Sequence, residues 1–181
     1  GTGLGPLVER VADRRSHREP EGAAFHRYLG PAAWAVAHGD DVLAEDLLAW
    51  VEGALPGSHR ELSADLRRFG WRGPALLALP DYRTFGQVMA HLLGGVAAWA
   101  RDAGWRGLAV LLDEAEYLDQ LESTSREMAT NVLRYLAFAS VEPGALPYGE
   151  GDVYRGGHAV HRALSTVFRP AQPLAVVCAF T

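Results

Sequence analysis

Two short runs of apolar residues stand apart from the helical periodicity of the rest of the chain. One covers residues 107–112 and is followed directly by Asp113 and Glu114, and the other covers residues 174–180. Uninterrupted apolar runs of this length, bounded by glycine, proline or charge, are typical of strands in a parallel sheet that is covered on both faces. We therefore predict two buried parallel strands joined by a right-handed helical connection.

Most of the remaining sequence predicts helices, because its apolar residues recur with helical spacing. The segments with this spacing cover residues 23–38, 43–51, 58–69, 84–103 and 118–139, with a further helix at about 158–168. Three pairs of residues have the spacing of a capping box, and these are Ser58 and Glu61, Thr84 and Gln87, and Thr124 and Glu127. The expected fold class is therefore α/β and mainly helical.

The chain is expected to form one domain that follows a flexible or short helical segment. That segment, residues 1–22, is rich in Gly, Pro, Glu and Arg. A chain of 181 residues is long enough for one domain with a sizeable core and too short for two of ordinary size. Residues 23–181 would form this domain, with a helical part at 23–103 and both strands in the part at 104–181.

Composition narrows the range of functions. The net charge of −5 gives no electrostatic reason to expect nucleic acid as a partner. All 17 basic residues are arginines, so the chain cannot contain a phosphate-binding loop of the G-x-x-x-x-G-K-[ST] type, which needs its lysine to reach the β- and γ-phosphates. No apolar stretch approaches the length of about 18 residues that a membrane helix requires. With Cys178 as its single cysteine, the protein is expected to be cytoplasmic.

The carboxylates of Asp113 and Glu114 are the first candidates for chemistry because they follow the first strand directly. Ligands of open α/β sheets bind just beyond the C-terminal ends of such strands. In P-loop ATPases the first acid at this place helps to hold Mg²⁺, and a following glutamate orients or deprotonates the attacking water. The residues fit a simpler interpretation equally well, in which two acids keep a surface turn soluble. Both interpretations stay open at this point.

The sequence around these acids resembles the Walker B region of the BREX-type ATP-binding proteins, a family of P-loop ATPases from bacterial defence and related gene clusters. The similar segment, Ala97 to Leu121, contains a helix end that reads A-G-W-R-G-L, the apolar strand and the acidic motif D-E-A-E. Trp50-Val51-Glu52-Gly53 is similar to an upstream element of the family, and the last apolar run ends in a threonine, as the family's final strand does. The resemblance extends over about residues 40–181.

The resemblance implies a partial P-loop core with the Walker B and sensor strands and a helical insertion before them. Asp113 would coordinate Mg²⁺ through water, Glu114 would be the catalytic base or water-orienting group, and Thr181 would sense the γ-phosphate. The family's Walker A loop and the strand before it have no counterpart among these residues. The intact protein is therefore expected to bind Mg²⁺ and ATP. This stretch alone should bind neither tightly, because the phosphate cradle supplies most of the anchoring donors.

Four further residues are weaker candidates. Arg162 and Arg169 lie near the second strand and would suit an arginine finger in an oligomer, although an exposed arginine at a helix end is the simpler explanation. His158 and His161 have the i, i+3 spacing that lets two imidazoles face one metal ion, but no third ligand is evident nearby.

In related ATPases the P-loop strand would lie beside the sensor strand. Because that edge lacks its neighbour here, we expect a homo-oligomer, strand exchange or cover by the N-terminal segment.

Two functions of different classes follow from these observations. In the first, the chain is the middle of an ATPase that couples ATP hydrolysis to remodelling or defence signalling in a larger complex. In the second, it is a non-catalytic helical protein-interaction module in which Asp113 and Glu114 only keep a strand end soluble. The first requires both acids to emerge at the same sheet edge as Thr181, whereas the second predicts a groove or apolar patch elsewhere.

Overall fold

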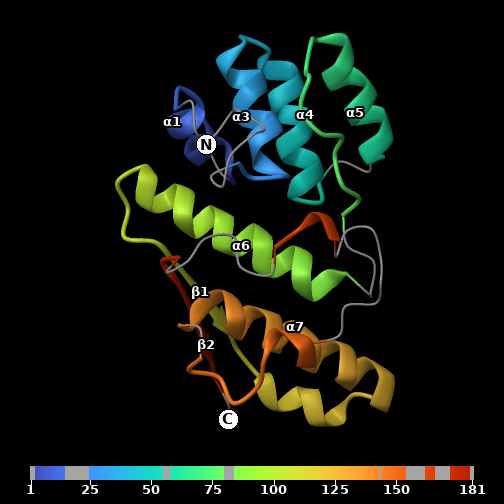
Figure 1. Ribbon diagram of the computed structural model, residues 1–181, viewed down its shortest axis with the longest axis vertical. Coiled ribbons are helices and arrows are strands. Elements are labelled where there is room, and N and C mark those ends of the chain that lie inside the picture. Colours follow the sequence, from blue (N-terminus) through green and yellow to red (C-terminus); the bar gives the residue numbers. More distant parts are fainter. Residues whose placement is uncertain are drawn as a thin grey trace. The chain divides into compact units, whose positions relative to one another are not determined.

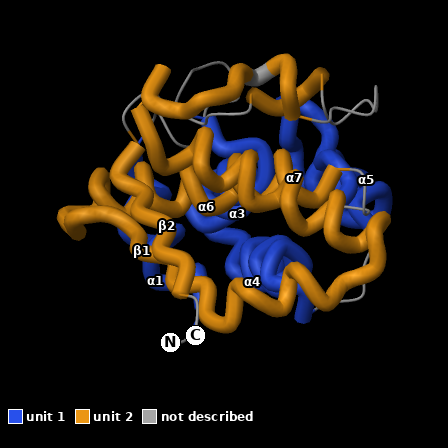
Figure 2. The backbone as a smooth tube through the Cα atoms, turned by 90° about the horizontal axis from the view of Figure 1, so that it is seen from below, with its two compact units in different colours: residues 1–79 blue, residues 80–181 orange. Residues whose placement is uncertain are grey.

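The computed structural model of the chain contains two compact units, Gly1–Leu79 and Pro80–Thr181 (Figures 1 and 2). This division differs from the boundaries at 22 and 103 drawn from the sequence. The structure describes residues 3–14, 25–54, 58–79, 84–142, 144–153, 162–165 and 172–179. Each unit has its own core and is described by itself.

The first unit is built from helices. Its described helices are α1 (Gly5–Ala12), α3 (Leu29–Ala37), α4 (Asp41–Val51) and α5 (His59–Arg68). Helix α3 packs against both α1 and α4 (Figure 1). The helices meet through fully or almost fully buried apolar side chains, which include Val8, Val11, Leu29, Leu47, Trp50 and Leu66.

Local capping fixes two helix starts in this unit, and the sequence predicted the second of them, the capping box at Ser58. The Asp40 carboxylate accepts a hydrogen bond from the Leu43 amide at 3.0 Å, so it caps α4. At the start of α5, Ser58 and Glu61 form a capping box in which each side chain accepts from the other residue's amide. Both caps form between residues at most three positions apart, so they can be recognised from the sequence without knowledge of the fold.

An aromatic cluster closes the core of the first unit. The ring of Trp71 stacks on Phe25 at 5.9 Å between centroids and meets Trp34 edge-on at 5.4 Å. The Tyr28 hydroxyl donates to the Ala78 carbonyl at 3.1 Å, and burial raises the pKa of this phenol. The buried Trp71 and the half-buried Trp34 therefore both belong to this core.

The second unit is an α/β arrangement around two strands. Its described elements are α6 (Phe85–Asp102), β1 (Leu108–Leu112), η1 (Ala115–Gln120), α7 (Ser123–Ser140), η2 (Glu150–Asp152) and β2 (Leu174–Cys178). Strands β1 and β2 are parallel neighbours in one sheet, and α6 and α7 pack along each other (Figure 1). The predicted fold class, mainly helical α/β with two parallel strands, is thus confirmed.

Only one face of the sheet is covered, whereas the sequence predicted cover on both faces. The side chains of Leu108 and Val110 belong, with Leu174 and Val176, to the same core as α6 and α7. The opposite face carries two register pairs, Ala109 with Ala175 and Leu111 with Val177, and all four side chains are exposed among the described residues. Leu111 is 76 % exposed and Val177 is 52 % exposed. The prediction was wrong because an apolar run shows that a face can be buried, not that another element of the structure covers it.

Small residues and one glutamine let α6 approach its neighbours closely. A Cβ built on Gly86 would lie 2.6 Å from the Tyr135 ring of α7, and one on Gly94 would lie 2.4 Å from the Gln172 amide. Gln172 is buried and donates to the Ala139 carbonyl of α7. Gly86 and Gly94 inside α6 therefore mark close packing against its neighbours.

Two of the three predicted capping boxes do not form in this unit. Thr84 makes no side-chain cap, and Gln87 instead donates through Nε2 to the distant Leu164 carbonyl at 2.8 Å. Helix α7 begins at Ser123, so Thr124 is already inside the helix and cannot cap it. In both cases a contact or a helix boundary set elsewhere in the fold overrides the local motif.

Gly107 is the residue that allows β1 to begin beside β2. Its φ is +144°, and a Cβ at this position would lie 2.1 Å from the Pro173 carbonyl oxygen. That same oxygen accepts the first cross-strand hydrogen bond, from the Leu108 amide at 2.9 Å. The start of the sheet thus requires a residue without a side chain.

Gly107→Ala is expected to lower the free energy of unfolding by about 2–3 kcal/mol, because it adds a clash with backbone to a strained φ. Gly104→Ala is the matched control, since Gly104 has a φ of +99° but no atom within 4 Å of an added Cβ. The control should lose only about 1 kcal/mol. Urea unfolding of the 181-residue chain measures both values, and equal midpoints for the two variants would contradict this account.

Candidate functional site

Asp113 and Glu114 lie at the C-terminal end of the parallel strand pair, directly after the last residue of β1. Cross-strand pairing continues past both strands. The Ala179 amide donates to the Leu112 carbonyl at 2.8 Å, and the Ala115 amide donates to the Ala179 carbonyl at 3.0 Å. Ala179, the residue that follows β2, therefore lies alongside the two acids.

The Asp113 side chain is held by its own backbone. Its Oδ1 atom accepts a hydrogen bond from the Glu114 amide at 2.9 Å, and the residue is exposed. Oδ2 makes no hydrogen bond to any described residue. One carboxylate oxygen is thus fixed while the other is open to solvent, which suits a carboxylate that acts on a metal ion through bound water.

Glu114 adopts a backbone conformation that glutamate seldom adopts. Its φ is 57° and its ψ is 36°, in the left-handed helical region, and no other non-glycine residue in the described ranges has a positive φ. Such a conformation costs of the order of 1–2 kcal/mol for a residue with a Cβ. Strain of this kind is concentrated at functional sites, where the surrounding structure holds it in place. The turn sends the chain from β1 straight into η1, and Glu114 stays exposed.

Arg126 fixes the segment that follows the acids. Its guanidinium donates to the carbonyl oxygens of Leu118 at 3.2 Å and Leu121 at 3.0 Å, and also to that of Asp119. These carbonyl groups lie at and just after the end of η1, so Arg126 ties this short helix to the first turn of α7. No feature of the sequence indicates this role of Arg126, because the role depends on the fold of the turn.

An apolar cavity of about 500 Å³ lies next to this sheet edge. It is formed by β1, η1, the start of α6 and most of α7, and its lining is almost entirely apolar. The lining residues are Phe85, Leu112, Leu118, Ser125, Met128, Ala129, Val132, Leu133 and Leu136. Sequence reasoning treated these side chains as core and missed the cavity.

The other predicted site residues are not brought to this edge by described structure. Thr181, Arg169, His158 and His161 lie outside the described residues, and Arg162 is described and exposed. Among residues with described positions, no group of three or more His, Cys, Asp or Glu side chains is arranged to hold a metal ion. None of the helices in the described ranges combines the length and the apolarity needed to span a membrane.

The comparison with protein families matches the part of the chain that contains Asp113 and Glu114. Residues 84–145 match the family described as BREX system ATP-binding protein BrxC/D. The resemblance to the BREX-type ATP-binding proteins is confirmed. The matched stretch contains α6, β1, the two acids, η1 and α7, and at the level of the family it supports an ATP-binding protein. No curated protein and no solved structure matches the chain.

Glu114→Gly is expected to raise the free energy of unfolding by about 0.5–1 kcal/mol, because glycine adopts the left-handed conformation without strain. Asp119→Gly is the matched control, an exposed acid in η1 whose φ is not positive. It should lower the free energy of unfolding by about 0.5–1 kcal/mol. Chemical denaturation of the 181-residue chain gives both changes, and a loss of stability in Glu114→Gly would show that the turn is not strained.

Proposed function

We propose that residues 84–179 are part of the ATP-binding domain of a P-loop ATPase. The observation that carries this proposal is the position of Asp113 and Glu114 at the C-terminal end of a parallel strand, with the chain after β2 hydrogen-bonded beside them. Open α/β sheets bind ligands at this end. The family match over residues 84–145 supports ATP as the ligand.

Each acid has a separate role in the proposal. The open oxygen of Asp113 would hold Mg²⁺ through water, and the carboxylate of Glu114 would orient or deprotonate the water that attacks the γ-phosphate. When bound, Mg²⁺ would neutralise charge that develops on the phosphate oxygens. The left-handed conformation of Glu114 fits these two separate roles. The chain changes direction at Glu114, so the two acids do not follow one straight strand.

Three more residues complete the proposed machinery. Thr181, two positions after Ala179, would act as the sensor of the γ-phosphate, and Arg162 or Arg169 would serve as an arginine finger in a homo-oligomer. The resulting hydrolysis cycle would drive remodelling or defence signalling in a larger complex. The proposal also requires a phosphate-binding lysine from outside the 181 residues, because the sequence contains none.

The open face of the sheet favours this proposal but also supports the second candidate, a non-catalytic interaction module. Parallel sheets are normally covered on both faces, so exposed Leu111 and Val177 fit a sheet that receives further elements. The same apolar face would suit a protein partner. Activity of the intact protein distinguishes the two functions.

In the intact parent protein, Glu114→Gln is expected to lower the rate of ATP hydrolysis by about 10²-fold while ATP still binds, because the acid would act on water and not on the nucleotide. Asp113→Ala should weaken Mg²⁺-dependent ATP binding. Phosphate release and binding of a fluorescent ATP analogue measure the two effects.

Asp119→Asn is the control for these variants, since Asp119 is an exposed acid in the neighbouring η1 and has no proposed role. Its hydrolysis rate should stay within about two-fold of the unmodified protein. Unchanged hydrolysis in Glu114→Gln would overturn the assignment of the base. A parent gene that encodes no phosphate-binding loop would overturn the ATPase itself and leave the interaction module.

A further inference from the structure

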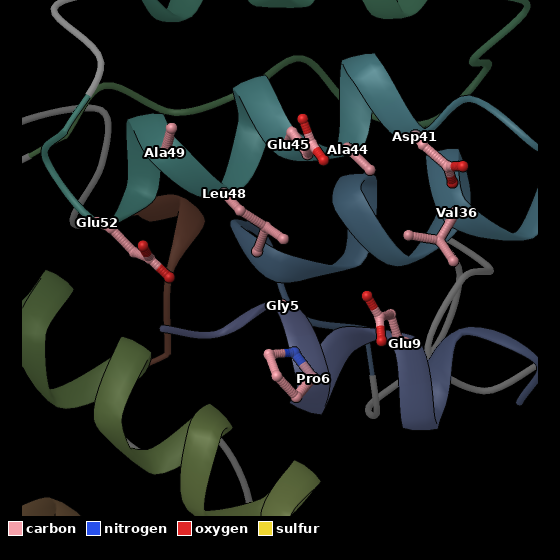
Figure 3. A pocket seen from close by; sticks show the side chains of 10 residues that line it. All are labelled: Gly5, Pro6, Glu9, Val36, Asp41, Ala44, Glu45, Leu48, Ala49 and Glu52. Atoms are coloured by element: carbon pink, nitrogen blue, oxygen red, sulfur yellow. The ribbon is translucent and has the colours of Figure 1, made fainter. Parts of the chain in front are cut away.

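A second candidate site lies in the first unit, in a groove between α1 and α4. The groove has a volume of about 610 Å³ and is lined by residues of α1, α3 and α4 together with Glu52, which follows α4 (Figure 3). Figure 3 shows Val36 and Leu48 extending into the space between α1 and α4. The groove belongs to the first unit alone, so it is independent of the sheet edge in the second unit.

The lining of the groove is acidic and contains no cation. Four carboxylates line it, from Glu9 on α1 and from Asp41, Glu45 and Glu52 on or next to α4. No arginine or lysine occurs between Arg27 and Arg60 in the sequence, so α3 and α4 contain neither. A concave surface with charges of one sign focuses the electrostatic potential and raises the local concentration of ligands with the opposite charge.

Three of these carboxylates have no partner in the described structure. Glu9, Asp41 and Glu45 are exposed, and none of their side chains forms a hydrogen bond or ion pair with a described residue. Glu52 is different, because its Oε1 accepts from the Leu4 amide at 2.6 Å just before α1 begins. The three unpaired acids are therefore available to a bound group, whereas Glu52 helps to hold α1 against α4.

The floor between these acids is apolar. Leu48 and Ala49 of α4 are half-buried there with Val36 of α3, and Ala44 is buried beneath them. The two alanines leave room that larger side chains would fill. An apolar floor with an acidic rim excludes nucleic acid, whose phosphates the carboxylates would repel, and it complements a ligand with one apolar face and flanking positive charges.

We propose that this groove binds an amphipathic helix with a basic flank, supplied by a partner protein. Helix α4 has 11 residues, so the groove extends over about 16 Å and matches about three turns of a bound helix. Apolar residues of the partner at i, i+3, i+4 and i+7 would pack on Leu48 and Val36. Its arginines or lysines would pair with Glu9 on one side and with Asp41 and Glu45 on the other.

The spread of the acids favours a helix over a metal ion. Asp41 and Glu45 are one turn apart on α4, and Glu9 comes from a different helix. In the described part of the chain, no three acids lie close enough to share one ion. Charges distributed along an apolar floor are suited to a partner that presents its own charges at intervals.

The test measures binding of a fluorescent peptide of about 14 residues, with leucines on one helical face and arginines on its flanks, to the 181-residue chain by anisotropy. Glu9→Gln with Glu45→Gln should weaken binding about ten-fold at low salt, because two rim charges are lost. The matched control is Asp13→Asn with Asp46→Asn, which removes equal charge from neighbouring acids outside the groove and should weaken binding less than about three-fold, because these charges act on the peptide only through solvent.

A second variant and a second peptide separate the apolar contribution from the electrostatic one. Leu48→Gln should weaken binding about five-fold at both low and high salt, because the apolar contact is not screened. A scrambled peptide of the same composition should bind at least ten-fold more weakly, since it has no apolar face. Equal binding of both peptides, or equal effects of the groove and control variants, would show only general charge attraction and would overturn the proposal.

Self-association is the remaining outcome. If the 181-residue chain sediments as a dimer, and Glu9→Gln with Glu45→Gln makes it monomeric, the groove holds a second copy and the proposal of a separate partner fails. A monomer that binds the ordered peptide supports it. None of these results depends on ATP, so the proposed ATPase stands or falls separately.

Discussion

The parallel pairing of β1 with β2 is the constraint on which the second unit depends. Two parallel strands alone are marginally stable, so the pair persists only because α6 and α7 cover one of its faces. The pairing begins where Gly107 lets the backbone approach Pro173, and it ends where Ala179 bonds on both sides of Asp113 and Glu114. The same backbone geometry therefore sets both the stability of the unit and the position of the candidate site.

The parts of the fold that could be predicted from the sequence are those determined within a few residues. The capping box at Ser58 needs only the next turn of chain and formed as expected, and the cap at Asp40 is equally local. The pair at Thr84 and Gln87 has the same motif, yet Gln87 bonds to a carbonyl far along the chain. A buried amide takes the partner that the tertiary structure offers, which the spacing of two residues cannot reveal.

The candidate site was predictable in its chemistry but not in its geometry. Two acids after an apolar strand are visible in the sequence, and the parallel register then places them at the expected edge. The left-handed turn at Glu114 was not visible, because glutamate has no preference for that conformation. Likewise, the sequence does not distinguish Arg126 from an ordinary surface arginine, because its hydrogen bonds to the carbonyl groups at the end of η1 depend on the fold of the turn.

The sheet is stable with one exposed face, so the exposed apolar residues are not explained by stability. Leu111 and Val177 face solvent, although covering them would contribute about 1.5–3 kcal/mol each. The covered face alone is enough to hold the two strands in register. Among described residues, the carboxylates of Asp113 and Glu114 form no ion pair and no helix cap. The one hydrogen bond that these two side chains make in the described part of the chain is that of Asp113 with the Glu114 amide, and the turn costs free energy that glycine or asparagine would avoid. This favours the proposed ligand over solubility as the reason for two acids at the strand end.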